Sequence, residues 1–116
     1  MLFRRHRLLA PDLLMAACAN ILWKKVRRKE LTQDVAMIAA RLLAGAKLEI
    51  EPMRGLLEPG ARLAITLDHP AYDCCYLALA EARGCDFVTA DGALARKLRT
   101  AGVPLNVAVV RDIGPA

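Results

Sequence analysis

Residues 72–91 read YDCCYLALAEARGCDFVTAD, and this stretch decides the fold class. Its first half is almost entirely apolar or small, which favours a buried helix over residues 72–82. Gly84 supplies the left-handed residue that commonly ends such a helix. The aromatic and β-branched residues at 87–89 then favour a short buried strand. A helix that leads directly into a buried strand is typical of an α/β domain.

The rest of the chain repeats this alternation of short apolar runs with helical patterns. Strands are predicted at 7–10, where Pro11 closes the run, at 47–51 near a sheet edge, and at 107–110. Helices are predicted at 12–29, from Thr32 to Gly45, from Pro59 to Leu67, and at 92–100 between Asp91 and Gly102. Helices between successive strands predict right-handed crossovers and a parallel sheet with helices on both faces.

Length and composition limit the number and the type of domains that the chain can form. A chain of 116 residues has room for one domain over residues 1–116, with a core of modest size. Its 56% hydrophobic content excludes a disordered chain. No run reaches the roughly 20 apolar residues that a membrane span needs, so no membrane partner is expected.

The spacing of the cysteines indicates the cellular compartment. The sequence has no C-x-x-C pair, which predicts buried free thiols in a reducing cytosol and therefore a cytoplasmic protein. The basic N-terminus and the apolar residues 8–19 imitate an export signal that would end at Cys18. Pro11 and Asp12 interrupt that apolar run, so an exported lipoprotein is the remote alternative. The cysteines are Cys18, Cys74, Cys75 and Cys85.

Positive charge is concentrated in the first quarter of the chain. Residues 1–29 hold eight basic residues and one acidic residue, whereas the whole chain has a net charge of +5. Such a patch attracts polyanions, nucleic acids above all, because binding releases their counterions. A solvated C-terminal helix end, where basic side chains are favoured, explains the patch equally well. The candidate RNA contacts are Lys24, Lys25, Arg27 and Arg28.

Two aspartates stand in apolar surroundings. Asp73 opens the apolar helix, and Asp91 follows the strand at 87–89. Ligands gather beyond the carboxyl ends of parallel strands, where both carboxylates would share one cleft if the crossover is regular. Paired carboxylates suit Mg²⁺ or Mn²⁺. The competing interpretation is that both aspartates only cap helices. His69, which precedes Pro70 in a turn, is expected to be structural.

Three segments carry a resemblance to a known family. APDLLMA at 10–16, followed by ANILW at 19–23, resembles the second conserved block of PIN-domain ribonucleases, most closely those of the VapC toxin type. HPAYDCCYLALA at 69–80 is similar to the third block, and FVTAD at 87–91 to the fourth. The segments occur in the family's order, and the likeness extends over residues 8–113.

The resemblance implies a PIN-like α/β fold with an acidic cleft that binds Mg²⁺ or Mn²⁺ and cuts RNA. In that pattern Asp73 and Asp91 are metal-binding, catalytic acids, and the hydroxyl of Thr89 helps to orient the cluster. The resemblance also implies a homodimer and a cognate antitoxin that silences the enzyme. Asp12 matches a family position whose role is capping.

The chain departs from the family pattern at its N-terminus. In the family, a central strand with the leading metal-binding aspartate lies well upstream of the APD segment, whereas here only nine residues, none of them acidic, precede Ala10. Where the family has a glutamate one turn into the next helix, this chain has Ala17. The sequence therefore predicts that the domain is incomplete at its N-terminus, with the first, central strand missing and two of four acids absent. An unpaired sheet predicts a dimer or aggregation of the isolated chain.

Three explanations of this departure stay open. One is that the reading frame of the natural protein begins upstream of Met1, and another is that a partner chain supplies the missing strand. The third is that the chain is a degenerate member of the family. Two hypotheses on function follow. The first is a metal-dependent endoribonuclease that the missing acids impair, and the alternative is a non-catalytic PIN-fold relict that binds an antitoxin-like partner or RNA.

Overall fold

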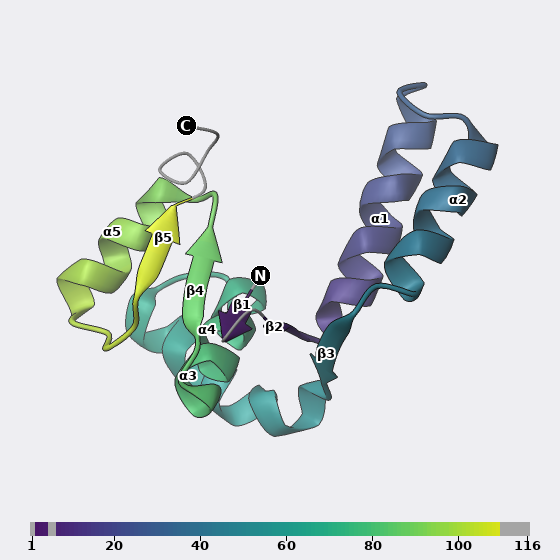
Figure 1. Ribbon diagram of the computed structural model, residues 1–116. Helices are drawn as coiled ribbons and strands as arrows, with labels where there is room; N and C mark the ends of the chain where they lie inside the picture. Colours follow the sequence, from purple (N-terminus) through teal and green to yellow (C-terminus); the bar gives the residue numbers. More distant parts are fainter. Residues whose placement is uncertain (1, 5–6, 110–116) are drawn as a thin grey trace, which may run out of the picture.

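The computed structural model describes residues 2–4 and 7–109 of the chain. Strands and helices alternate along most of it and form a mixed α/β domain, as the sequence predicts (Figure 1). The described strands make one sheet in the order β3-β2-β1-β4-β5. They are β1 (Leu2–Arg4), β2 (Arg7–Pro11), β3 (Leu48–Glu51), β4 (Asp86–Thr89) and β5 (Val107–Val109). The predicted last strand extended to Val110, which lies outside the described residues.

The centre of the sheet corrects two predictions. The outer pairs β2–β3 and β4–β5 are parallel, but β1 runs antiparallel to both β2 and β4, so the sheet is mixed rather than parallel. Only two residues separate β1 from β2, and so short a link joins antiparallel strands, whereas a parallel pair needs a crossover of a dozen or more residues. The place of the central strand, predicted to be missing, is filled by β1.

Strand β3 lies at an edge of the described sheet, as its alternating sequence predicts. Two acidic residues of this strand, Glu49 and Glu51, form ion pairs with Arg83 at the end of helix α4 (Ala71–Arg83). These side chains are only partly exposed, so the paired charges are screened less by solvent than fully exposed ones. The ion pairs tie the edge strand to the helical layer.

The described helices divide into two groups (Figure 1). Helices α1 (Leu13–Arg27) and α2 (Gln33–Ala44) form a hairpin that stands away from the others. The short 3₁₀ helix η1 (Met53–Leu56) leads into α3 (Leu57–Leu67), which packs against α4, and α5 (Gly92–Ala101) lies beside β5. No described helix combines the length and the apolar character that a membrane span requires.

Several helix ends follow the local sequence signals, whereas Asp12, expected to act as a cap, stands at the N-cap position of α1 without a side-chain capping bond. The Oγ1 atom of Thr32 accepts a hydrogen bond from the backbone N–H of Val35 at 3.2 Å, so Thr32 caps α2 as predicted. Gly84 and Gly102 end α4 and α5 with φ values of 63° and 69°, the left-handed conformation that favours glycine. The cap at Gly84 sets where β4 can begin, and β4 leads into the loop that carries Asp91.

Helix α4 is the centre of the core. Its residues Leu77, Ala78, Leu79 and Ala80 are buried, and they belong to one apolar cluster with residues of β4 and α5. Each fully buried leucine contributes about 1.5–3 kcal/mol to the free energy of unfolding. A helix that is apolar on nearly all sides needs such cover, which explains why residues 72–82 identify the fold class.

The cysteines largely follow the prediction of buried free thiols. Cys74, Cys75 and Cys85 are buried, Cys18 is partly buried, and all four are free. Burial raises the pKa of the Cys74 and Cys75 thiols above the ordinary value. Because the thiolate is the reactive form, these two residues serve packing rather than chemistry.

Gly60 allows α3 and α4 to pack closely, and its substitution tests this contact. A Cβ atom at Gly60 would lie 2.9 Å from the Sγ atom of Cys75. We expect Gly60→Ala to lower the free energy of unfolding, because overpacking costs about 1–3 kcal/mol and the gain in helix propensity is at most about 1 kcal/mol.

Urea unfolding of a double-mutant cycle with Cys75→Ala measures this effect. In the Cys75→Ala background the Gly60→Ala substitution should become neutral or stabilising, because the clashing sulfur is gone. Gly55→Ala is the matched control, since a Cβ atom at Gly55 meets nothing within 4 Å. Equal effects of Gly60→Ala in both backgrounds would contradict the close contact.

Candidate metal site

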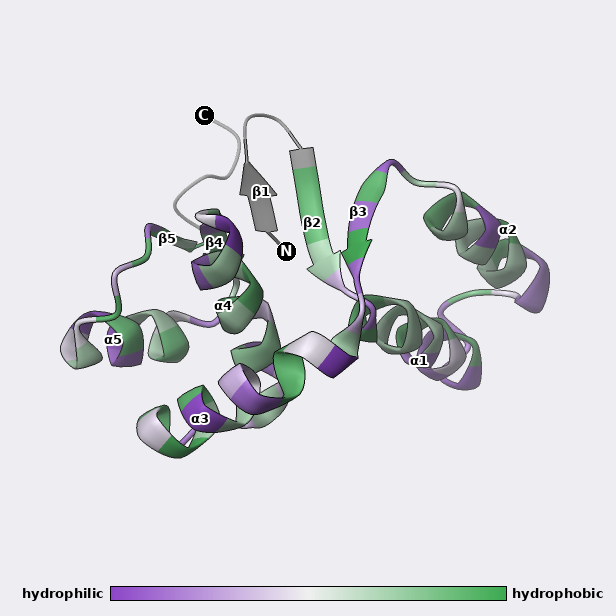
Figure 2. Ribbon diagram, turned by 90° about the horizontal axis from the view of Figure 1, so that it is seen from below, coloured by the Kyte–Doolittle hydropathy of each residue, from purple (hydrophilic) through white to green (hydrophobic). Residues whose placement is uncertain are grey.

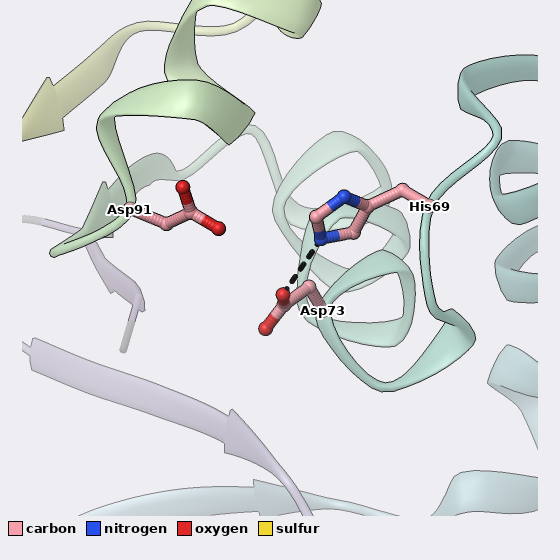
Figure 3. Close-up of side chains that lie close together, drawn as sticks. All are labelled: His69, Asp73 and Asp91. Carbon is pink, nitrogen blue, oxygen red and sulfur yellow. Dashed lines mark hydrogen bonds and ion pairs between the residues drawn. The ribbon is translucent and has the colours of Figure 1, made fainter.

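Three side chains from different parts of the fold converge at one point (Figure 3). They are His69 in the link between α3 and α4, Asp73 in the first turn of α4, and Asp91 in the loop between β4 and α5. One ligand atom of each residue lies within 4.8 Å of the ligand atoms of the other two. We call these three residues the His–Asp cluster.

Asp73 reaches the cluster from the start of α4. Pro70 stands at the N-cap position of this helix and makes no side-chain capping bond. The carboxylate of Asp73 makes none either: its Oδ2 atom is hydrogen-bonded to the Nε2 atom of His69 at 2.8 Å. The Asp73 side chain is half exposed, whereas that of His69 is only 10% exposed. The capping interpretation therefore does not describe Asp73, whose carboxylate faces the imidazole and solvent.

Asp91 is held by the start of α5. Its Oδ1 atom accepts hydrogen bonds from the backbone N–H groups of Ala93 at 3.0 Å and Leu94 at 3.1 Å, which is the predicted N-cap. The Oγ1 atom of Thr89 accepts a hydrogen bond from the backbone N–H of Asp91 at 3.0 Å. Thr89 thus contacts the main chain of Asp91, and capping of α5 fixes the direction in which the carboxylate points.

A pocket of about 520 Å³ adjoins the cluster. Helix α1, helix α4 and strand β4 form its walls, with Asp73 and Thr89 among the lining residues. Ala17, where the resembling family has a glutamate, lines the same pocket. Tyr76 also lines the pocket. Burial is the main cause that raises the pKa of its phenol, and the neighbouring Cys18 and Asp73 raise it further. The Tyr76 hydroxyl therefore stays protonated at neutral pH and can donate a hydrogen bond into the pocket.

The donor set fits a hard divalent cation. Mg²⁺ is commonly bound by one or two carboxylates together with several waters and the phosphate oxygens of a substrate. Asp73 and Asp91 supply two carboxylates, and their exposure leaves room for waters and phosphate. The two residues that could hold Mg²⁺ or Mn²⁺ are thus those singled out from the sequence.

The four basic residues proposed to contact RNA do not lie at this cluster. They belong to the C-terminal end of α1 and the residue after it, at the far tip of the hairpin (Figure 1). Lys25 is ion-paired with Glu30 at 3.2 Å, and the guanidinium of Arg27 stacks on Trp23 at 5.4 Å from the ring centroid. The basic end of α1 and the His–Asp cluster are therefore separate features of the surface.

Sequence reasoning missed two residues of the site. His69, expected to be structural, belongs to the cluster, and its spacing of four residues from Asp73 was the available signal. Lys97 of α5 lies beside it, with its Nζ atom 3.5 Å from the Nδ1 atom of His69. No spacing could reveal Lys97, because α5 meets the link between α3 and α4 only in the folded domain.

Comparison with protein-family models and with curated proteins finds no match to this chain.

Proposed function

We propose that this chain is a PIN-like, metal-dependent endoribonuclease of the VapC toxin type, with Asp73 and Asp91 as its metal-binding acids. One observation carries the proposal. The two aspartates that the motifs single out come from different elements, and their carboxylates lie within 4.8 Å of each other and of His69. A pocket of about 520 Å³, lined in part by Asp73 and Thr89, lies beside them and offers space for a substrate.

The cofactor of this proposal is Mg²⁺ or Mn²⁺. When bound, such an ion activates water and offsets the charge that develops on a phosphate. The protein's part is to hold the two carboxylates in place, Asp91 through the cap of α5 and Asp73 through His69. The Tyr76 hydroxyl and the apolar wall around Ala17 shape the approach of the substrate.

RNA is the substrate class of this proposal. The net charge of +5 and the basic end of α1 favour a polyanion, and this attraction weakens as salt is added. A cytoplasmic location, a homodimer and a cognate antitoxin are parts of the same proposal, and they rest on the sequence resemblance.

Asp91→Asn tests the proposal without removing the helix cap. Asparagine caps helices as well as aspartate does, so we expect the melting temperature of the metal-free variant to stay close to that of the parent chain. The loss of one of two ligand charges should weaken Mn²⁺ binding by at least about 10-fold, since the charge count of the ligands sets such affinities.

Titration calorimetry with Mn²⁺ measures the affinity, and Asp34→Asn on helix α2 is the matched control. Unchanged Mn²⁺ affinity in Asp91→Asn, together with unchanged RNA cleavage, would show that Asp91 is not a metal ligand.

The alternative function, a non-catalytic binding module, is favoured by the α1–α2 hairpin. Both helices carry apolar residues along their length (Figure 2). Among them Trp23, Ile38 and Leu42 are 55%, 51% and 70% exposed. Exposed apolar patches commonly mark protein interfaces. A folded chain that binds neither Mg²⁺ nor Mn²⁺ would favour this alternative over the nuclease.

A further inference from the structure

A chain of polar contacts links α5 to Asp73 through His69. The Nζ atom of Lys97 donates a hydrogen bond to the backbone carbonyl of Asp68 at 3.0 Å and lies 3.5 Å from the Nδ1 atom of His69. On the other side of the ring, Nε2 is 2.8 Å from the Oδ2 atom of Asp73 (Figure 3). The imidazole is therefore in contact with a cation through one nitrogen and with an anion through the other.

These neighbours select one form of the imidazole. A lysine ammonium has three donors and no acceptor, so the Nδ1 atom that faces it must offer a lone pair. The neutral ring then carries its hydrogen on Nε2, and Nε2 donates that hydrogen to the Asp73 carboxylate. A nitrogen that carries a hydrogen has no lone pair for a metal ion, which excludes Nε2 as a ligand in this form.

Lys97 also holds the segment that carries the ring. Asp68 ends α3 with a φ value of 50°, a left-handed conformation that is uncommon outside glycine, and its carbonyl is the acceptor of the Lys97 hydrogen bond. The same ammonium group thus fixes the position of the link before α4 and the hydrogen-bonding state of His69. With the ring only 10% exposed, few other orientations are open to it.

We infer that His69 is a positioning residue that orients Asp73, with Lys97 fixing its tautomer, and is not a third metal ligand. The inference rests on the proposed metal site. The Nε2–H group of His69 holds Oδ2 of Asp73 and thereby fixes the direction of this carboxylate. Oxygen-only coordination by the protein favours Mg²⁺ or Mn²⁺, whereas an imidazole ligand would favour Zn²⁺ or Ni²⁺.

The tautomer can be measured without any metal or RNA. The sequence contains two histidines, His6 and His69, so the imidazole signals in long-range ¹H–¹⁵N spectra can be assigned with His69→Gln. We expect the hydrogen of His69 on Nε2, and a weaker preference for this tautomer in Lys97→Met but not in the control Lys25→Met, because only the Asp73 carboxylate then selects it. A hydrogen on Nδ1, or an unchanged preference in Lys97→Met, would overturn the inference.

Metal binding separates positioning from ligation. The glutamine amide in His69→Gln can donate to Asp73 and accept from Lys97, but it cannot replace an imidazole ligand. We therefore expect His69→Ala to weaken Mn²⁺ binding about 10–100-fold, as is typical when an outer hydrogen bond to a ligand is lost, and His69→Gln to restore most of that affinity.

Equal weakening in both variants, with a parallel loss of Ni²⁺ affinity, would show that His69 is a ligand and overturn the inference. Failure of the parent chain to bind Mn²⁺ would contradict the proposed function itself, while the tautomer measurement still decides the role of Lys97 and His69.

Discussion

Asp73→Asn is expected to abolish metal-dependent RNA cleavage. The substitution removes one of the two carboxylates of the proposed metal site, and asparagine is a far weaker ligand for a hard cation than a carboxylate. The loss of activity should exceed the 10–100-fold effect typical of outer-shell substitutions, so we expect at least about 100-fold. Single-turnover cleavage of a labelled RNA in Mn²⁺ measures it.

The fold should survive this substitution. The amide oxygen of asparagine can still accept a hydrogen bond from Nε2 of His69, and position 73 is half exposed, so the melting temperature should change little. Asp34→Asn again serves as the control for the loss of one exposed acid. Full cleavage activity in a folded Asp73→Asn protein would show that the metal site has been assigned to the wrong residues.

Ala17→Glu is expected to have the opposite effect. Ala17 lies on α1, is half-buried and lines the pocket with Asp73 and Thr89, so a glutamate there would add a carboxylate to the site. A third acidic ligand should raise Mn²⁺ affinity about 10-fold or more, since ligand charge count sets the affinity of carboxylate sites. Cleavage should increase in parallel, and calorimetry with a cleavage assay measures both.

Ala17→Gln is the control for the size of the new side chain. It fills the same space with an amide in place of a carboxylate and should leave Mn²⁺ affinity near that of the parent chain. If the glutamate and glutamine variants bind Mn²⁺ equally well, position 17 does not face the cation. The two variants therefore test the placement of α1 against the His–Asp cluster.

The parts of the fold that the sequence predicts well are those with strong local signals. Helix α4 and strand β4 follow from an apolar helical run, Gly84 and a β-branched strand, and Asp91 caps α5 through bonds to Ala93 and Leu94. Such signals act over a few residues, and tertiary packing does not need to be known to read them. Element type and order are correspondingly close to the prediction.

Strand direction was not predictable in the same way. Alternation and apolar runs identify a strand but are the same for parallel and antiparallel neighbours. The direction of β1 follows from the short link at residues 5–6, and the segment Leu2–Arg4 was not recognised as a strand because it is short and partly basic. The central strand therefore differs from the prediction both in its presence and in its direction.

The site shows the same division between local and long-range information. Asp73 and Asp91 could be named from the motifs, because each stands at the junction of a helix with an apolar segment. Lys97 is far from His69 in sequence, and their contact depends on how α5 packs against the α3–α4 link. The basic residues at the end of α1 formed the most visible charge pattern, yet the hairpin carries them away from the cluster (Figure 1).

Titration of the parent chain with Mn²⁺ and with Mg²⁺, followed by thermal unfolding, shows whether the folded domain binds a divalent cation. At a metal concentration 100 times the Kd, binding to the folded state adds about 2.7 kcal/mol to the free energy of unfolding. For a domain of this size that is a rise of about 10 °C or more in Tm. We expect this rise with one ion bound per chain, and its loss in Asp73→Asn. A folded parent chain whose Tm does not respond to either ion would contradict the proposed metal site.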